Sequence, residues 1–262
     1  MAFTNINGIV LHHEYLMEYA DEPVVVFANS LGTDFRVWLP LIDELTENWS
    51  LLLYDMRGHG LSDAGQVPYT IEDHAADLIG LIDHLGIKSA ILCGLSVGGL
   101  IVQSVYKQRP DLVEKINLCD TAAKVGTTDS WNARIATVTE KGIGAIADGI
   151  LKVWFTPDFH DKRAAELAGY RNMLTRQSVD GYNATCVALR EADLRADAAN
   201  IKVPVLCIVG DQDGSTPPDL VKSTADLIPG ARFEIIKNAG HIPCVEQPEA
   251  LAELLTGFIN ED

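Results

Sequence analysis

A serine flanked by glycines is the strongest chemical signal in this sequence. The segment that begins at Ala90 reads Ala-Ile-Leu-Cys-Gly-Leu-Ser-Val-Gly-Gly, which places Ser96 in a Gly-x-Ser-x-Gly pattern. The apolar run predicts a buried strand, and residues 97–108 predict a helix that stops at Pro110. A strand, such a turn and a helix in succession are typical of a nucleophile elbow, a strained turn that exposes a serine hydroxyl. We therefore predict that Ser96 is a catalytic nucleophile; the alternative is a glycine-rich turn with an incidental serine.

A serine nucleophile needs a general base, and His241 is the best candidate among seven histidines. His241 stands in Asn-Ala-Gly-His-Ile-Pro, in the loop after the last predicted strand. Such a loop lies at the carboxyl edge of a parallel sheet, where Ser96 is also expected. The alternative for a loop histidine beside glycine is a solvated side chain. His12 and His13 are expected on a surface strand, away from this edge.

Three aspartates could orient the base. Asp211 and Asp213 follow the strand predicted at residues 205–209, in Gly-Asp-Gln-Asp-Gly-Ser-Thr-Pro-Pro. Asp213 lies deeper in that loop, so we predict it as the acid, whereas Asp211 is expected to cap or solvate the turn. Asp120 also directly follows a predicted strand, and it remains the alternative acid.

Two backbone amides could stabilise negative charge on the attacked carbonyl. The first is that of Val97, at the start of the helix behind the serine. The second is that of Leu31, in the loop after the first long strand, although an ordinary polar turn explains that loop equally well. The sequence has no His-Glu-x-x-His motif and no cluster of cysteine and histidine, so we predict neither a metal nor a cofactor.

The elements that must position these groups alternate along the chain. Strands are predicted at residues 24–28, 51–54, 90–93, 115–119, 205–209 and 233–236, with a hairpin turn at Asn7-Gly8 and helices at 70–85, 97–108 and 248–259. This alternation predicts an α/β fold, a mostly parallel sheet with helices on both faces. Only helical patterns occur between residues 122 and 197. We therefore predict a core of residues 1–121 and 198–262, interrupted by a helical cap insertion at 122–197.

Composition excludes several kinds of partner. The chain has 37 acidic and 20 basic residues, and its formal charge of −17 repels nucleic acid and anionic membranes. No apolar run is long enough to span a membrane, and the first 15 residues show no signal-peptide pattern. The five cysteines are scattered and mostly lie in apolar runs, which predicts reduced core residues in a cytoplasmic protein.

Motifs along nearly the whole chain resemble those of a known protein family. Besides the elbow, they include Asp-Thr-Ala-Ala from Asp120, Trp-Asn-Ala-Arg-Ile from Trp131, Trp-Phe-Thr-Pro from Trp154 and Gly-Tyr from Gly181. The set resembles the α/β-hydrolase fold and, more narrowly, the 3-oxoadipate enol-lactonases of aromatic catabolism. Asn29 and the serine after it stand where most α/β hydrolases have His-Gly, a departure that this lactonase group shares. The resemblance implies opening of a small anionic enol-lactone to 3-oxoadipate, with no cofactor.

Such a substrate carries a carboxylate, so an acidic protein must supply a local cation for it. Arg134 lies three residues after Trp131, one helical turn along the same face. We predict that the indole packs on the lactone ring while the guanidinium binds the carboxylate, and that Trp154 also contacts the substrate. The alternative is that Arg134 is solvated and Trp131 only packs the cap onto the core. Five other arginines of the insertion are possible: Arg163, Arg171, Arg176, Arg190 and Arg195.

Other functions are compatible with these motifs. A carboxylesterase or a carbon–carbon bond hydrolase of the same fold is the nearest enzymatic alternative, and a non-catalytic small-molecule receptor could keep the same residues. Ser96 counts against dehalogenases and epoxide hydrolases, which have an aspartate at that position. Gly58-x-Gly60 is not interpreted as a dinucleotide site, because Asp63 occupies the third glycine position.

Overall fold

The computed structural model describes residues 1–16, 24–45 and 49–261, and its sheet has eight strands in the order β1-β2-β4-β3-β5-β6-β7-β8. The first two pairings, β1 with β2 and β2 with β4, are antiparallel, and all others are parallel. The predicted mostly parallel α/β sheet is therefore confirmed. The strands are β1 (Ala2–Ile6), β2 (Ile9–Leu16), β3 (Val24–Ala28), β4 (Ser50–Tyr54), β5 (Ala90–Leu95), β6 (Val113–Cys119), β7 (Val205–Gly210) and β8 (Arg232–Ile236).

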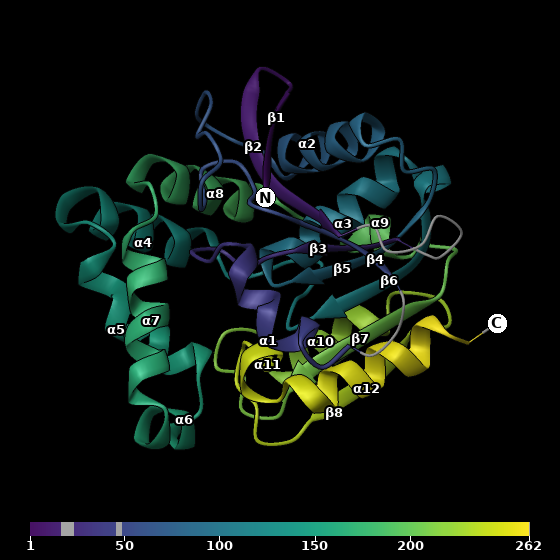
Figure 1. Ribbon diagram of the computed structural model, residues 1–262. Helices are drawn as coiled ribbons and strands as arrows, with labels where there is room; N and C mark the ends of the chain where they lie inside the picture. The colour runs from purple at the N-terminus through teal and green to yellow at the C-terminus, as the bar shows by residue number, and fades with distance from the viewer. Residues whose placement is uncertain (17–23, 46–48, 262) are drawn as a thin grey trace.

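Helices cover both faces of the sheet (Figure 1). On one face α2 packs against α3, and on the other α1 packs against α12. The start of α2 has the predicted capping box, in which Thr70 and Asp73 accept hydrogen bonds from each other's backbone amides. None of the described helices is long and apolar enough to cross a membrane. The core helices are α1 (Leu39–Ile42), α2 (Ile71–His84), α3 (Val97–Gln108), α10 (Pro218–Ala225), α11 (Pro243–Glu246) and α12 (Pro248–Ile259), with 3-10 turns at Phe35–Trp38 and Pro110–Leu112.

Between β6 and β7 the described chain is helical, as predicted. We call residues 122–197 the cap segment and keep the predicted bounds as a proposal. Figure 1 shows α4 to α7 standing to one side of the sheet, where α4 packs on α8 and α5 packs on α7. The short α9 spans the proposed boundary and contacts α3 of the core. These helices are α4 (Thr128–Lys141), α5 (Gly144–Trp154), α6 (Pro157–Lys162), α7 (Ala164–Thr175), α8 (Val179–Glu191) and α9 (Arg195–Ala198).

The hairpin differs from the prediction in one respect, because both of its histidines are buried. His12 Nδ1 lies 2.7 Å from Asp55 Oδ2, and His13 Nε2 lies 3.0 Å from Thr4 Oγ1. The expectation of a surface strand was wrong because β2 is not an edge strand. It pairs with β1 on one side and β4 on the other, and both histidines acquire polar partners from neighbouring strands or loops.

A buried ion pair joins the loop after β4 to α2. Arg57 donates from Nε and Nη2 to the Asp77 carboxylate at 2.6 and 2.7 Å. The two side chains are only 12% and 1% exposed. Asn7 of the hairpin turn also donates to Asp77, at 3.0 Å. One carboxylate therefore holds three segments of the core together.

We expect Asp77→Ala to lower the free energy of unfolding by about 3 kcal/mol, because it leaves the Arg57 guanidinium buried without its partner. Urea denaturation measures this loss. Asp83→Ala, also in α2, is the matched control. It removes the exposed pair with Arg109 and should cost less than about 1 kcal/mol. Equal losses in the two variants would contradict a special role for the buried pair.

Candidate active site

Ser96 stands at a sharp turn between β5 and α3. Its φ of 56° and ψ of −117° place it in a backbone region that residues other than glycine rarely adopt. The Ser96 amide donates to Cys119 O at 3.0 Å, and Thr121 Oγ1 donates to Ser96 O at 2.6 Å. Hydrogen bonds from the end of β6 and the loop after it therefore hold the strained turn in place.

Both flanking glycines are required by close backbone contacts. A Cβ atom on Gly94 would lie 2.4 Å from Gly98 O, and one on Gly98 would lie 2.1 Å from Ala28 O. The first turn of α3 consequently rests directly on the end of β3. This contact places Val97 beside the loop that carries Leu31.

The amides of Leu31 and Val97 are available to an oxyanion. Within the described chain, neither N–H has a hydrogen-bond acceptor. The loop around Leu31 is held from within: Asn29 Nδ2 donates to Thr33 O at 2.8 Å, and Thr33 Oγ1 donates to Ser30 O at 2.8 Å. A fixed loop with an unoccupied donor suits an oxyanion hole, the role that we continue to propose for these amides.

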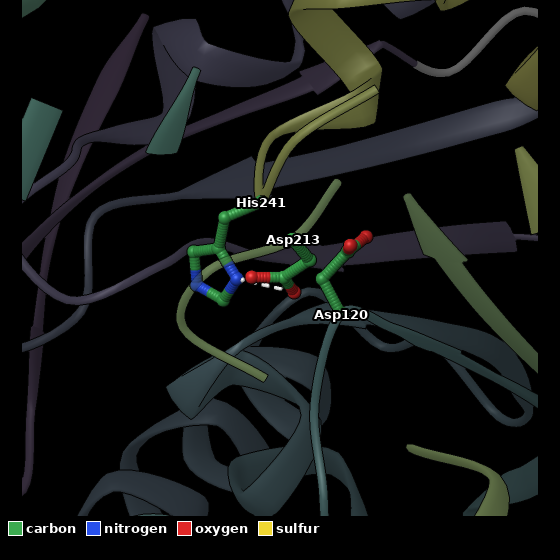
Figure 2. Close-up of side chains that lie close together, drawn as sticks. All are labelled: Asp120, Asp213 and His241. Atoms are coloured by element: carbon green, nitrogen blue, oxygen red, sulfur yellow. Dashed lines mark hydrogen bonds and ion pairs between the residues drawn. The ribbon is translucent and has the colours of Figure 1, made fainter. Parts of the chain in front are cut away.

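His241 and Asp213 form a buried hydrogen-bonded pair (Figure 2). His241 Nδ1 lies 2.8 Å from Asp213 Oδ2. Asp213 also accepts from the amides of Ser215 and Thr216 and from Thr216 Oγ1, at 2.7, 3.0 and 2.7 Å. Burial alone would raise the pKa of Asp213, but the charge of His241 and these hydrogen bonds lower it to about 2. An ionised Asp213 keeps a proton on Nδ1, which leaves Nε2 of His241 to act as a base.

Asp120, the alternative acid, lies beside Asp213 (Figure 2). Its carboxylate is fully buried; Oδ1 accepts from Gly210 N at 2.9 Å, and Oδ2 has no partner among the described residues. Burial and the neighbouring charge of Asp213 raise the pKa of Asp120 well above its usual value. The hydrogen bond of His241 Nδ1 goes to Asp213, and none joins Asp120 to His241 among the described residues, so the geometry favours Asp213.

The same three side chains offer ligand atoms that all lie within 4.8 Å of one another, close enough to hold a metal ion. The atoms of His241 and Asp213 that face each other are already joined by a hydrogen bond. Both Asp213 oxygens also take donors from the following loop. The hydrogen bonds of His241 and Asp213 therefore already use the atoms that would face a metal ion.

A cavity of about 20 Å³ lies over Ser96 and brings core and cap together. Trp131, Arg134 and Trp154, the three predicted substrate contacts, all line it. Its volume suits about one water molecule, so a larger ligand requires the cap side chains to move. Sequence reasoning assigned no role to several further lining residues: Ser30, Val125, Ile150, Tyr182, Leu189 and Ser215. Ser30, Tyr182 and Leu189 lie in segments that carried the resemblance, but the sequence contained no signal for Val125, Ile150 or Ser215.

Ser96 and His241 line this cavity together. No hydrogen bond joins the Ser96 hydroxyl to His241 within the part of the chain that the structure describes. Such contacts are often long until substrate binds, so the geometry is compatible with proton transfer. A larger groove of about 960 Å³, between α7 and the N-terminal hairpin, contains none of the predicted site residues.

Arg134 stacks on Trp131 at one wall of the cavity. The guanidinium carbon lies 4.9 Å from the centroid of the indole. Trp131 is itself fixed, because its Nε1 donates to Val125 O at 2.8 Å. The predicted pairing of an aromatic ring and a cation is thus present beside Ser96.

Comparisons with known proteins agree with this geometry. Residues 23–248 match the sequence profile of the alpha/beta hydrolase fold. The chain is 37% identical to 3-oxoadipate enol-lactonase 2 of Acinetobacter baylyi, over 88% of this chain and 86% of that relative. It is 32% identical to 3-oxoadipate enol-lactonase 1 of the same organism, over 90% and 88% of the two chains. The crystal structure of an enol-lactonase from Burkholderia xenovorans superposes with a TM-score of 0.96 at 37% identity, covering 99% of this chain and 100% of that one. The resemblance inferred from the motifs is confirmed.

We expect Asp213→Asn to lower kcat for a neutral aryl ester by about a thousandfold or more, because the amide offers His241 the wrong hydrogen-bonding partner. Asp120→Asn should lower kcat less than about tenfold, since the hydrogen bond that orients His241 comes from Asp213. Steady-state kinetics of the two purified variants measure the ranking. The reverse ranking would assign the acid to Asp120.

Proposed function

The chain belongs to the alpha/beta hydrolase fold family, and from that premise we propose that it is a serine hydrolase that opens 3-oxoadipate enol-lactone to 3-oxoadipate in aromatic catabolism. The observation that carries the proposal is the cavity over Ser96, which is lined by the loop of Leu31, by His241 and by a cation stacked on an indole. The two curated relatives support the choice of lactone.

In the proposed reaction, Nε2 of His241 accepts the Ser96 proton as Ser96 Oγ attacks the lactone carbonyl. The amides of Leu31 and Val97 donate to the oxyanion that forms. Its collapse breaks the ring C–O bond, expels an enolate and leaves an acyl-enzyme. The enol is a comparatively good leaving group, so its protonation matters less than in amide cleavage. The imidazolium of His241 gives its proton to the expelled enolate, which returns Nε2 to its basic form. His241 then activates water for deacylation, and Asp213 stabilises the imidazolium in both steps.

Arg134 is the best candidate to bind the substrate carboxylate. Among the described residues, no acidic side chain forms an ion pair with it, and it lines the cavity that contains Ser96. Arg176 also has no such ion pair, but it lines the larger groove. Each of the other four arginines considered is paired with an acidic neighbour: Arg163 with Glu166, Arg171 with Asp148, Arg190 with Glu191 and Arg195 with Asp193. A cation without a counter-ion keeps its full attraction for an anionic substrate.

A substrate panel tests the proposed activity. The enol-lactone, a neutral aryl ester and a diketone cleaved at a carbon–carbon bond are assayed with the same protein. Turnover of the enol-lactone with the highest kcat/KM supports the proposal. Turnover of the diketone alone would replace it with a carbon–carbon hydrolase, and no turnover of any substrate would favour a receptor.

A cytoplasmic location is part of the proposal. All five cysteines are unpaired and buried, which supports a reducing compartment. The formal charge of −17 supports a small-molecule substrate over nucleic acid or an anionic membrane.

We expect Ser96→Ala to lower kcat for every turned-over ester by at least about a thousandfold while the protein stays folded. Circular dichroism checks the fold, and steady-state kinetics check the activity. Ser104→Ala, at a buried serine further along α3, is the control and should keep kcat within about twofold. Near-wild-type activity in soluble Ser96→Ala protein would refute the nucleophile.

We expect Arg134→Ala to cost about 1.5–3 kcal/mol in kcat/KM for the enol-lactone, the value of a charged hydrogen bond. Hydrolysis of a small neutral ester should stay nearly unchanged, because the triad is untouched. Arg176→Ala, at the other unpaired arginine, should affect neither substrate. Equal losses on both substrates in Arg134→Ala would indicate a structural role instead.

A further inference from the structure

The backbone around His241 is held by groups outside the sheet. The amide of His241 donates to Trp154 O at 2.8 Å, and the amide of Gly240 donates to Glu246 Oε2 at 2.6 Å. No side chain fits at position 240, since a Cβ there would lie 2.5 Å from Trp154 O. The last residues of α5 and α11 therefore both accept hydrogen bonds from the loop that carries His241.

The second oxygen of the same carboxylate binds the cap. Glu246 Oε1 accepts from Thr156 N at 3.0 Å and from Thr156 Oγ1 at 2.7 Å. Thr156 is the N-cap of α6, and its Oγ1 also accepts from Phe159 N. Glu246 thus connects the N-cap of a cap helix, 90 positions before it in the chain, to the loop of His241.

The bridge lies next to the substrate cavity. Trp154 presents its side chain to the cavity over Ser96 while its carbonyl accepts from the amide of His241. A further contact, from Arg163 Nη1 to Val245 O at 3.0 Å, joins the cap to α11 one residue before Glu246. The cap segment is therefore bonded directly to the loop of His241 through Trp154 and to α11 through Arg163 and Thr156.

We propose that Glu246 is a positioning residue that ties the cap to the loop of His241 and so holds the histidine in place for proton transfer with Ser96. This inference rests on the proposed serine triad, but it does not depend on the identity of the lactone. Glu246 touches no reacting atom, so it acts through Gly240 and Thr156 alone.

Three donors converge on the two oxygens of Glu246, and a carboxylate is the side chain of this length that can accept all of them. A glutamine has one acceptor oxygen, so its NH₂ group must face either Gly240 N–H or Thr156. Glu246→Gln therefore breaks one side of the bridge without changing the size of the side chain. Burial raises the pKa of Glu246, so removing the buried charge offsets part of the free energy lost with the broken hydrogen bond, and Tm should change little.

Hydrolysis of p-nitrophenyl acetate tests the inference, because this neutral ester reports on the triad whatever the natural substrate is. We expect Glu246→Gln to lower kcat at least about tenfold with KM within about twofold. Its Tm should stay within about 2 °C of wild type. Thr156→Val removes the hydroxyl that donates to Glu246 on the cap side, and it should also lower kcat. Glu249→Gln, at an exposed glutamate of α12, is the matched control and should match wild type in both measurements.

Wild-type kcat in Glu246→Gln would overturn the inference, as would an equal loss in Glu249→Gln. A loss of kcat that appears only together with a large fall in Tm would also overturn it, because it would show a merely structural role. If Ser96→Ala keeps its activity, the triad itself fails. If Ser96→Ala is inactive while Glu246→Gln is fully active, only the positioning role of Glu246 fails.

Discussion

The first turn of α3 lies so close to the end of β3 that no side chain fits between the two backbones. Gly98 meets that requirement, and the tight turn into the helix forces Ser96 into a left-handed backbone conformation. The proposed oxyanion amides lie on the two sides of this contact, in Val97 at the start of α3 and in Leu31 in the loop after β3. The position of the proposed nucleophile and the positions of the proposed oxyanion donors are thus consequences of one close packing contact.

Asp120 and Asp213, two buried aspartates near His241, show how the environment shifts the pKa values of chemically identical groups in opposite directions. Asp213 accepts three hydrogen bonds from its own loop and one from His241, which outweigh the desolvation of its charge. Asp120 accepts one, from Gly210, and faces the negative charge of its neighbour. Two adjacent carboxylates in a dry interior cannot both ionise easily, so the negative charge is more favourable on the one that accepts more hydrogen bonds.

In our proposal, the cap of this acidic protein binds an anionic ligand. Long-range repulsion from a charge of −17 is screened by salt, whereas a guanidinium at the cavity wall acts at contact distance. Arg134 retains that capacity because no acidic side chain among the described residues forms an ion pair with it. The cap also shares hydrogen bonds with the loop of His241 through Trp154 and Glu246, so the proposed ligand-binding element is linked to the proposed base.

The sequence by itself determined the features that depend on short stretches of chain. The helix of α3, the capping box at Thr70, the order of strands and helices and the elbow around Ser96 follow from local periodicity and from motifs of a few residues. Glycine spacing and the motifs of the cap were also sufficient to find the family. These features could be predicted because each is encoded by neighbours in sequence.

Only the tertiary structure decided which groups meet across the chain. The burial of His12 depends on a partner 43 residues away, and the bridge at Glu246 depends on one 90 residues away. The opposite pKa shifts of Asp120 and Asp213 likewise depend on how many hydrogen-bond donors the fold brings to each carboxyl group. Solvent exclusion and hydrogen-bond geometry arise from packing of distant segments, and a pattern read along the chain carries no record of them.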